Sequence, residues 1–400
     1  MTALLSLAVL VLIAFIGSFV YKKINVTSFW ASGIVYSGIF YIILGYVIGP
    51  QILSLVTKEI FRELNVLFTL VLGWAGFLTG LQLSIKSLKR FPRLYYGEVT
   101  VNYLTVMVLL IVSLGLYNAF LVSRFFSLQD IIMFSVIGAI SSPIMLGVLM
   151  KEYSVPGRLS YRLQFNSAYD NILGVLVGGL VFMAEGILLG HRNWNLQQSI
   201  GILFPYIVVG LAVFLYNFIH ESMKSRQEKF LLFISLLILT IGTAYYFSQS
   251  ILFCSFLFGF GLANGKISSR ELYRDIQELE KPLYILLLIF AGIKLELYGD
   301  RWIFLFLTSF FVLRLFIKYF IERTTYRIFE KEESIPHSIG IAGIGMGGLS
   351  LAMALDYLIT YHSGQASIFL LVIVVSLVPN DVLSIEYLKR ILINKDSRTI

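Results

Sequence analysis

Two stretches decide the fold of this chain: residues 137–150, IGAISSPIMLGVLM, and residues 340–353, GIAGIGMGGLSLAM. Each lies within a long apolar run, yet each contains residues that interrupt a helix. In the first stretch, Pro143 lacks a backbone donor and clashes with the preceding turn. The hydroxyls of Ser141 and Ser142 can bond the backbone groups that the proline frees. The first stretch therefore predicts a helix that is broken in its middle.

The second stretch is broken by glycine. Five glycines fall within nine residues, and the last three are Gly345, Gly347 and Gly348. Such a segment unwinds easily, and irregular backbone at membrane depth is tolerated only inside protein or beside a cavity. Glycine in membrane helices also serves simple packing. Its pairing with the Ser-Ser-Pro stretch favours a transporter site, because two interrupted helices in corresponding places of two halves are the best sequence sign of one.

The rest of the chain predicts an all-α, polytopic membrane protein. Of 400 residues, 58% are hydrophobic and only 14% are charged, whereas a soluble domain carries about 25% charged residues. A membrane span needs about 20 mostly apolar residues. This window predicts about 13 transmembrane helices. They cover roughly residues 3–21, 31–50, 64–84, 99–121, 129–150, 163–187, 200–220, 229–247, 249–264, 281–298, 302–323, 338–360 and 366–388.

The order and charge of these spans predict topology. The broken helices are the fifth and the twelfth, as an inverted repeat of helices 2–6 and 9–13 requires. With the N-terminus outside, 24 of the 31 lysines and arginines fall on the inside and six on the outside. This asymmetry predicts a multi-pass protein of the cell (inner) membrane with a cytoplasmic C-terminus. It also explains the net charge of +8 without a nucleic-acid partner.

The sequence predicts one transmembrane domain over residues 1–400 and no soluble regulatory domain. The longest polar segment, residues 323–337, is short enough to be a loop. The stretch GFGLANGKISS lacks the first glycine of a phosphate loop because Phe260 stands there, so no nucleotide site is expected. The histidines have no metal-ligand spacing, and we find no nucleophile or paired acids. We therefore expect neither an enzyme, nor a cofactor, nor a metal beyond a transported monovalent cation.

Asp170 is the main candidate for an ion site. It lies about a third of the way into the sixth predicted helix, in FNSAYDNILGVLVGG, where a charge costs at least about 2.5–3.5 kcal/mol. Asn166 is one turn away on the same face, and Asn171 follows directly. Oxygen donors around one carboxylate suit a monovalent cation or a proton, and Ser141 and Ser142 could add to them. The alternative is a structural carboxylate that a neighbouring helix satisfies.

Arg314 is the deepest basic residue and needs a counter-charge, for which Asp170 is the best candidate. Its alternative role is that of a snorkelling arginine. Lys318, one turn nearer the cytoplasm, is interpreted as an interface anchor. Asp356 and Asp381 fall near predicted helix ends and are given a structural role.

In sequence order, several motifs resemble the monovalent cation–proton antiporter superfamily, especially its bacterial Kef- and NapA-like branch. They are LGYVIGPQIL, FLTGLQL, SSPIMLGVLMKE, YDNILGV, FLFGFGLAN, LIFAGIKLEL, VLRLFIKYFIER and GMGGLSLAMAL. The resemblance implies inverted repeats, a moving core, a dimerisation scaffold and hence a homodimer. The two broken helices would cross near the ion-binding acid, and Arg314 would occupy the family's basic position.

The resemblance leaves the register of the acid pair open. Asp170 and Asn171 align with the paired acids, of which the second is the usual essential one. A shift by one residue would instead make Tyr169 first and Asp170 second. The expected function is exchange of protons for Na⁺ or K⁺ by alternating access, with Asp170 as the shared site. The alternative is a non-transporting sensor or scaffold built on an antiporter fold.

Overall fold

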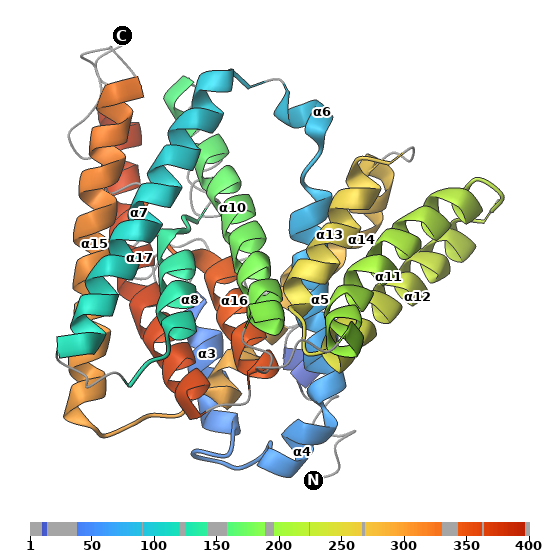
Figure 1. The fold of residues 1–400 in the computed structure, drawn as a ribbon, viewed down its shortest axis with the longest axis horizontal. Helices are drawn as coiled ribbons and strands as arrows, with labels where there is room; N and C mark the ends of the chain where they lie inside the picture. Colours follow the sequence, from blue (N-terminus) through green and yellow to red (C-terminus); the bar gives the residue numbers. More distant parts are fainter. Residues whose placement is uncertain are drawn as a thin grey trace.

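The structure is a computed structural model and describes residues 10–13, 38–89, 91–120, 125–142, 158–188, 196–223, 225–265, 269–329, 343–361 and 364–396. All regular structure in these residues is helical. Figure 1 labels the main helices. They are α3 (Ile39–Ile48), α4 (Lys58–Glu63), α5 (Asn65–Leu81), α6 (Ile85–Leu88), α7 (Arg93–Phe120), α8 (Leu128–Ala139), α10 (Arg158–Leu188), α11 (Leu196–His220), α12 (Arg226–Tyr246), α13 (Ile251–Ala263), α14 (Ser269–Lys294), α15 (Arg301–Phe329), α16 (Gly347–Thr360) and α17 (Gly364–Asp396).

Twelve of the predicted spans have a helix at their place. Among the described residues, six helices are long and apolar enough to cross a membrane, and five shorter helices are also apolar. The first predicted span, residues 3–21, lies almost wholly outside the described residues. Several helices extend further than predicted, because a helix can continue past the bilayer where its side chains are charged. The clearest cases are α14, which begins at Ser269, and α15, which ends at Phe329.

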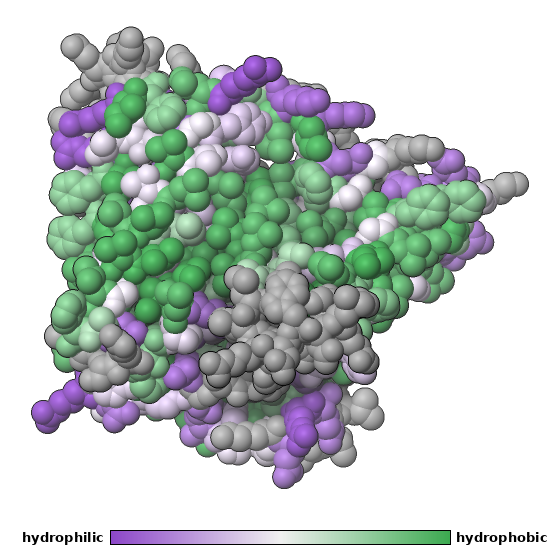
Figure 2. Space-filling model, viewed as in Figure 1, coloured by the Kyte–Doolittle hydropathy of each residue, from purple (hydrophilic) through white to green (hydrophobic). Residues whose placement is uncertain are grey.

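The outer surface suits lipid. On α11, the large apolar side chains of Ile207, Phe214 and Phe218 are 63%, 63% and 70% exposed. Figure 2 shows hydrophobic residues gathered in a band across the middle of the molecule, with hydrophilic residues toward two opposite edges. A soluble protein rarely exposes so large an apolar surface. The band therefore marks the part of the chain that lies in the membrane.

Four helices form the centre of a layer that we call the scaffold panel: α3 packs on α14, and α5 packs on α13, with α11 and α12 beside them. Glycines bring their backbones into direct contact. A Cβ on Gly45 would lie 2.1 Å from the Ile289 carbonyl oxygen, and one on Gly292 would lie 2.0 Å from that of Ile42. Only glycine permits such an approach.

The contacts in the panel fit the predicted inverted repeat. In that repeat α3 corresponds to α13 and α5 to α14, so the pair α3–α14 corresponds to the pair α13–α5. Both pairs make the same kind of contact. In the second pair, a Cβ on Gly76 would lie 2.2 Å from the Leu252 oxygen, and one on Gly259 would lie 2.2 Å from the Phe77 oxygen.

The remaining long helices, α7, α8, α10, α15, α16 and α17, pack into a second layer that we call the core bundle. Each of its two interrupted spans shows, within the described residues, one helix and the non-helical backbone beside it. Helix α8 ends at Ala139 and is followed by non-helical backbone, and α16 begins only at Gly347 after a non-helical segment. The two unwound segments meet at a point that we call the crossing, where the Ser142 backbone N–H donates to the Gly345 oxygen at 2.9 Å. Pro143, predicted to cause the first break, lies outside the described residues.

Candidate ion-binding site

The first half of the site is the C-terminus of α8, whose last carbonyls have no partner within the helix. Two buried cations from α15 bind them. Arg314 donates from Nε to the Gly138 oxygen at 2.9 Å and from Nη2 to the Ile140 oxygen at 3.0 Å. Lys318 Nζ donates to the Ala139 oxygen at 2.7 Å and to the Ile140 oxygen at 2.8 Å. Positive charge at this helix end is also favoured by the helix dipole.

The second half of the site is the N-terminus of α16, where the dipole favours negative charge. Asp381 of α17 supplies that charge, because its Oδ1 accepts hydrogen bonds from the backbone N–H groups of Met346 at 2.7 Å and Gly347 at 3.3 Å. Arg314 joins this half to the first, since its Nη1 donates to the Ile344 oxygen. One guanidinium therefore holds both unwound segments.

Asp170 lies beside this crossing and is only 2% exposed. Its Oδ2 accepts a hydrogen bond from the Ser141 hydroxyl at 2.6 Å. The same oxygen is 4.0 Å from Lys318 Nζ, which also donates to Ser141 Oγ at 2.8 Å. The structure thus brings together Asp170, Ser141 and Lys318, of which the sequence analysis proposed the first two.

A stripe of charge runs along α15. Arg314, Lys318 and Glu322 are spaced four residues apart and share one face of the helix. All three are buried. Glu322 Oε1 is 3.9 Å from Lys318 Nζ, and Glu322 Oε2 accepts the Gly343 N–H at 3.2 Å. Lys318 therefore stands almost equally far from two carboxylates.

Four oxygens of the residues that the sequence analysis proposed as ligands have no hydrogen-bond partner among the described residues: Asp170 Oδ1, Asn171 Oδ1, Asn166 Oδ1 and Ser142 Oγ. A buried polar atom without a partner costs about 1–3 kcal/mol, so such atoms usually mark an absent water or ion. Oxygen ligands suit hard cations. The donor set therefore fits a small monovalent cation as cargo.

The Nδ2 of Asn166 binds a second buried cluster, whereas its Oδ1 has no hydrogen-bond partner among the described residues. Its Nδ2 donates to Glu98 Oε1 at 3.2 Å and to the Tyr326 hydroxyl at 2.8 Å. Glu98 in turn accepts a hydrogen bond from Arg162 Nε at 3.0 Å. Both charged residues are buried. Sequence reasoning placed Arg162 in a loop and missed Glu98, because α7 and α10 were predicted to begin too late in the chain.

Three interpretations from the sequence are corrected by the structure. Lys318 is not an interface anchor, because its side chain is fully buried. Arg314 interacts with Asp170 only at longer range, and its direct partners are the backbone carbonyls. Asp381 is not near a helix end, because α17 continues to Asp396; both Asp381 and Asp356, which does lie near the end of α16, are buried and bind a helix N-terminus, a structural role as expected.

Comparison with known proteins identifies the family. Residues 10–380 match the family described as sodium/hydrogen exchanger, transmembrane. The chain belongs to the sodium/hydrogen exchanger family. Members of this family are membrane transporters. The family and the fold of this chain are therefore those of an antiporter and not of an enzyme. No curated protein matches the sequence.

Solved structures show the same fold. The sodium proton antiporter MjNhaP1 from Methanocaldococcus jannaschii at pH 8 has a TM-score of 0.63 at 13% sequence identity, over 98% of this chain and 98% of that chain. An electron-microscopy structure of MjNhaP1 has a TM-score of 0.61 at 16% identity, over 96% of this chain and 95% of that chain. At these identities the likeness shows the exchanger fold.

Proposed function

We propose that this exchanger-family protein exchanges protons for a small monovalent cation, with Asp170 as the shared site. The observation that carries the proposal is the position of Asp170: a buried carboxylate at the crossing of two broken helices, with one oxygen bonded to Ser141 and the other without a partner among the described residues. A proton or a cation can occupy that free oxygen, and each excludes the other. Na⁺ is the first candidate because a sodium proton antiporter shares the fold.

The charges around the crossing support a one-for-one exchange. Among the described residues there, the three carboxylates are Asp170, Glu322 and Asp381, and the two cations are Arg314 and Lys318. With every group ionised, this cluster has a net charge of −1, and a buried net charge is costly. One proton or one monovalent cation neutralises it. We therefore expect no net charge to move, so the exchange rate should not depend on membrane potential.

The test uses proteoliposomes with an acid interior, monitored by an acid-quenched dye. Addition of Na⁺, K⁺ or Li⁺ to the wild-type protein should restore the fluorescence, and the cation effective at the lowest concentration is the substrate. The Asp170→Asn variant should give no recovery, because a neutral amide cannot exchange a proton for a cation. Full recovery with that variant would overturn the proposal.

A non-transporting sensor is the second candidate. It is favoured by Asn171, which stands where the family's second acid is expected. The two functions differ in one measurement. A cation that raises the melting temperature of the purified protein without any dye recovery indicates a sensor, whereas recovery indicates an exchanger.

We also propose how the molecule sits in the cell membrane. The face that carries α4, here called the α4 face, would be outside because few lysines and arginines lie there. The homodimer that the family resemblance implies would form through the scaffold panel. Cross-linking in native membranes tests it, and a band of twice the monomer mass is the expected result.

A further inference from the structure

Helix α16 lies at the boundary between the two layers. It belongs to the core bundle, where it packs on α17 and α8, and it also contacts α5, α13 and α14 of the scaffold panel. If the core bundle moves against the panel during exchange, the contacts of α16 must break and re-form. One of these contacts involves a carboxylate that the proposed exchange reaction does not use.

That carboxylate is Asp356, which is 2% exposed. Its Oδ2 accepts the hydroxyl hydrogen of Ser250, and its Oδ1 accepts the backbone N–H groups of Ile251 at 3.0 Å and Leu252 at 3.5 Å. Ser250 is the N-cap of α13. A core residue thus completes the N-terminal cap of a scaffold helix, where the dipole adds to the attraction.

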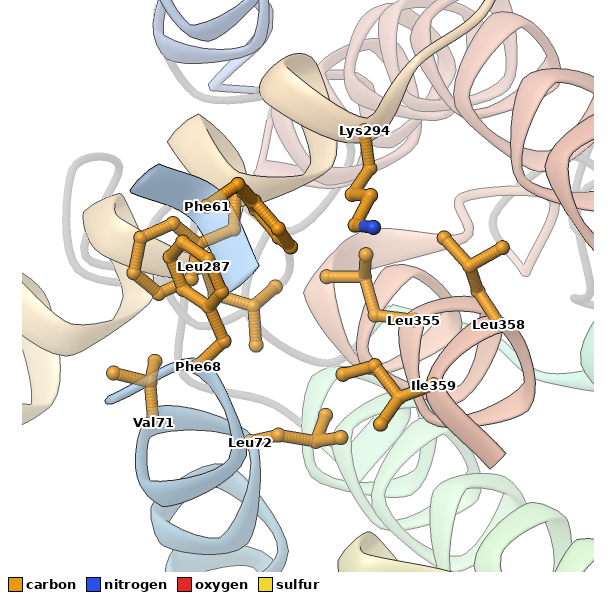
Figure 3. A pocket seen from close by; sticks show the side chains of 10 residues that line it. Phe61, Phe68, Val71, Leu72, Leu287, Lys294, Leu355, Leu358 and Ile359 are labelled. Atoms are coloured by element: carbon orange, nitrogen blue, oxygen red, sulfur yellow. The ribbon is translucent and has the colours of Figure 1, made fainter. Parts of the chain in front are cut away.

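An apolar layer lies next to this contact and beside α4. Figure 3 shows its side chains converging from both layers. From the panel come Phe68, Leu72 and Phe290, and from α16 come Leu355, Leu358 and Ile359. The space they leave is about 20 Å³, enough for about one water molecule. Its apolar lining offers nothing to a hydrated cation.

Lys294 closes the rim of this space. Its Nζ lies 4.2 Å from the centre of the Phe61 ring, a cation–π contact between α14 and α4. The space between α16 and the scaffold panel beside α4 is therefore nearly filled by packed side chains in this conformation.

We propose that Asp356 is a latch: its bonds to the N-terminus of α13 hold α16 against the scaffold panel and keep the apolar layer closed toward the α4 face. This positioning role rests on the proposed function, because a latch that releases is useful only if the two layers move. When the latch opens, Asp356 leaves the donors of α13, and the layer of Leu355, Leu358 and Ile359 separates from the panel.

The test measures accessibility and does not need transport. Cys254, the only cysteine, is buried and is replaced by serine. A single cysteine is placed in the layer (Leu358→Cys) and labelled from the α4 face with a membrane-impermeant maleimide. Asp356→Asn should raise the labelling rate about tenfold, which corresponds to about 1.4 kcal/mol. Ser250→Ala removes one donor only and should raise the rate by less.

Two controls separate a latch from general loosening. Asp130→Asn also removes a buried carboxylate from a contact of α16, because Asp130 accepts the hydroxyl hydrogen of Tyr357, but both partners lie in the core bundle. It should leave the labelling of Leu358→Cys unchanged. A cysteine at exposed Leu53, outside the layer, should label equally in all backgrounds.

Two outcomes would overturn the latch: an unchanged labelling rate in Asp356→Asn, or an equal increase in Asp130→Asn. Dye recovery is measured on the same proteins. Unchanged labelling together with normal wild-type exchange refutes the latch alone. Faster labelling without any exchange by the wild type supports the latch and refutes the proposed function.

Discussion

At the scale of single residues, Gly347 shows how tightly the crossing is built. It is the first residue of α16 and has a φ of +67°, a conformation that costs other residues about 1–2 kcal/mol. A Cβ at this position would lie 2.4 Å from Ser142 Oγ. Both the backbone and the space around it therefore require glycine.

We expect Gly347→Ala to destabilise the protein by at least about 1–2 kcal/mol and to abolish exchange, because it forces the unwound segments apart. The thermal midpoint of the purified protein and dye recovery measure the two effects. Gly115→Ala is the matched control, since nothing lies within 4 Å of a Cβ there. Equal midpoints for the two variants would contradict the prediction.

Lys318 also belongs to this scale. Its Nζ is a donor to the Ala139 and Ile140 oxygens and to Ser141 Oγ. Lys318→Met should leave these buried acceptor oxygens without a donor. Each acceptor that finds no other donor should destabilise the protein by about 1–3 kcal/mol. The thermal midpoint should fall, whereas Lys86→Met, at an exposed position, should leave it unchanged. A midpoint equal to that of the wild type would show that water replaces the ammonium.

At the scale of elements, the sequence predicted the spans well and their ends less well. Apolar length determines which segments enter the bilayer, so α5, α12 and α13 lie where they were expected. Helix ends outside the bilayer depend on charged side chains, which hydropathy does not resolve. Helix α15 was predicted to end at residue 323 and continues to Phe329.

That error explains the misplaced role of Lys318. A helix ending at residue 323 puts Lys318 near the interface, whereas the longer helix puts it deeper. The four-residue spacing of Arg314, Lys318 and Glu322 could have revealed the charged stripe. The partner of Lys318 could not be predicted, because it depends on how α15 packs against the end of α8. The breaks in α8 and α16 were predictable, since proline and glycine act locally.

The testable prediction at the scale of elements concerns the glycine contacts of the scaffold panel. Gly292→Ala on α14 should lower the thermal midpoint, because its Cβ would meet the Ile42 oxygen at 2.0 Å and a backbone atom moves only with its whole helix. Gly242→Ala on α12 has nothing within 4 Å of the new Cβ. This control should be neutral or stabilising by up to about 1 kcal/mol. If both substitutions behave alike, the helices are less tightly packed than described.

At the scale of the whole molecule, orientation is the open prediction. Single cysteines at Leu53 and Gln227, both exposed, would lie on opposite sides of the membrane. In intact cells, an impermeant maleimide should label Leu53→Cys, whereas Gln227→Cys should label only after permeabilisation. The reverse pattern would invert the topology inferred from the lysines and arginines.

The glycine contacts of the panel have a consequence for how any motion could be observed. At Gly45 and Gly292 the two backbones touch without side chains between them. The contact therefore contains no side chain that could change its rotamer, and the two helices cannot easily slide past each other. The spacing between α3 and α14 should stay constant whichever ion is present. The distance between probes on these two helices would therefore serve as an internal reference. A change in the distance from either probe to α16 would then report displacement of the core bundle alone.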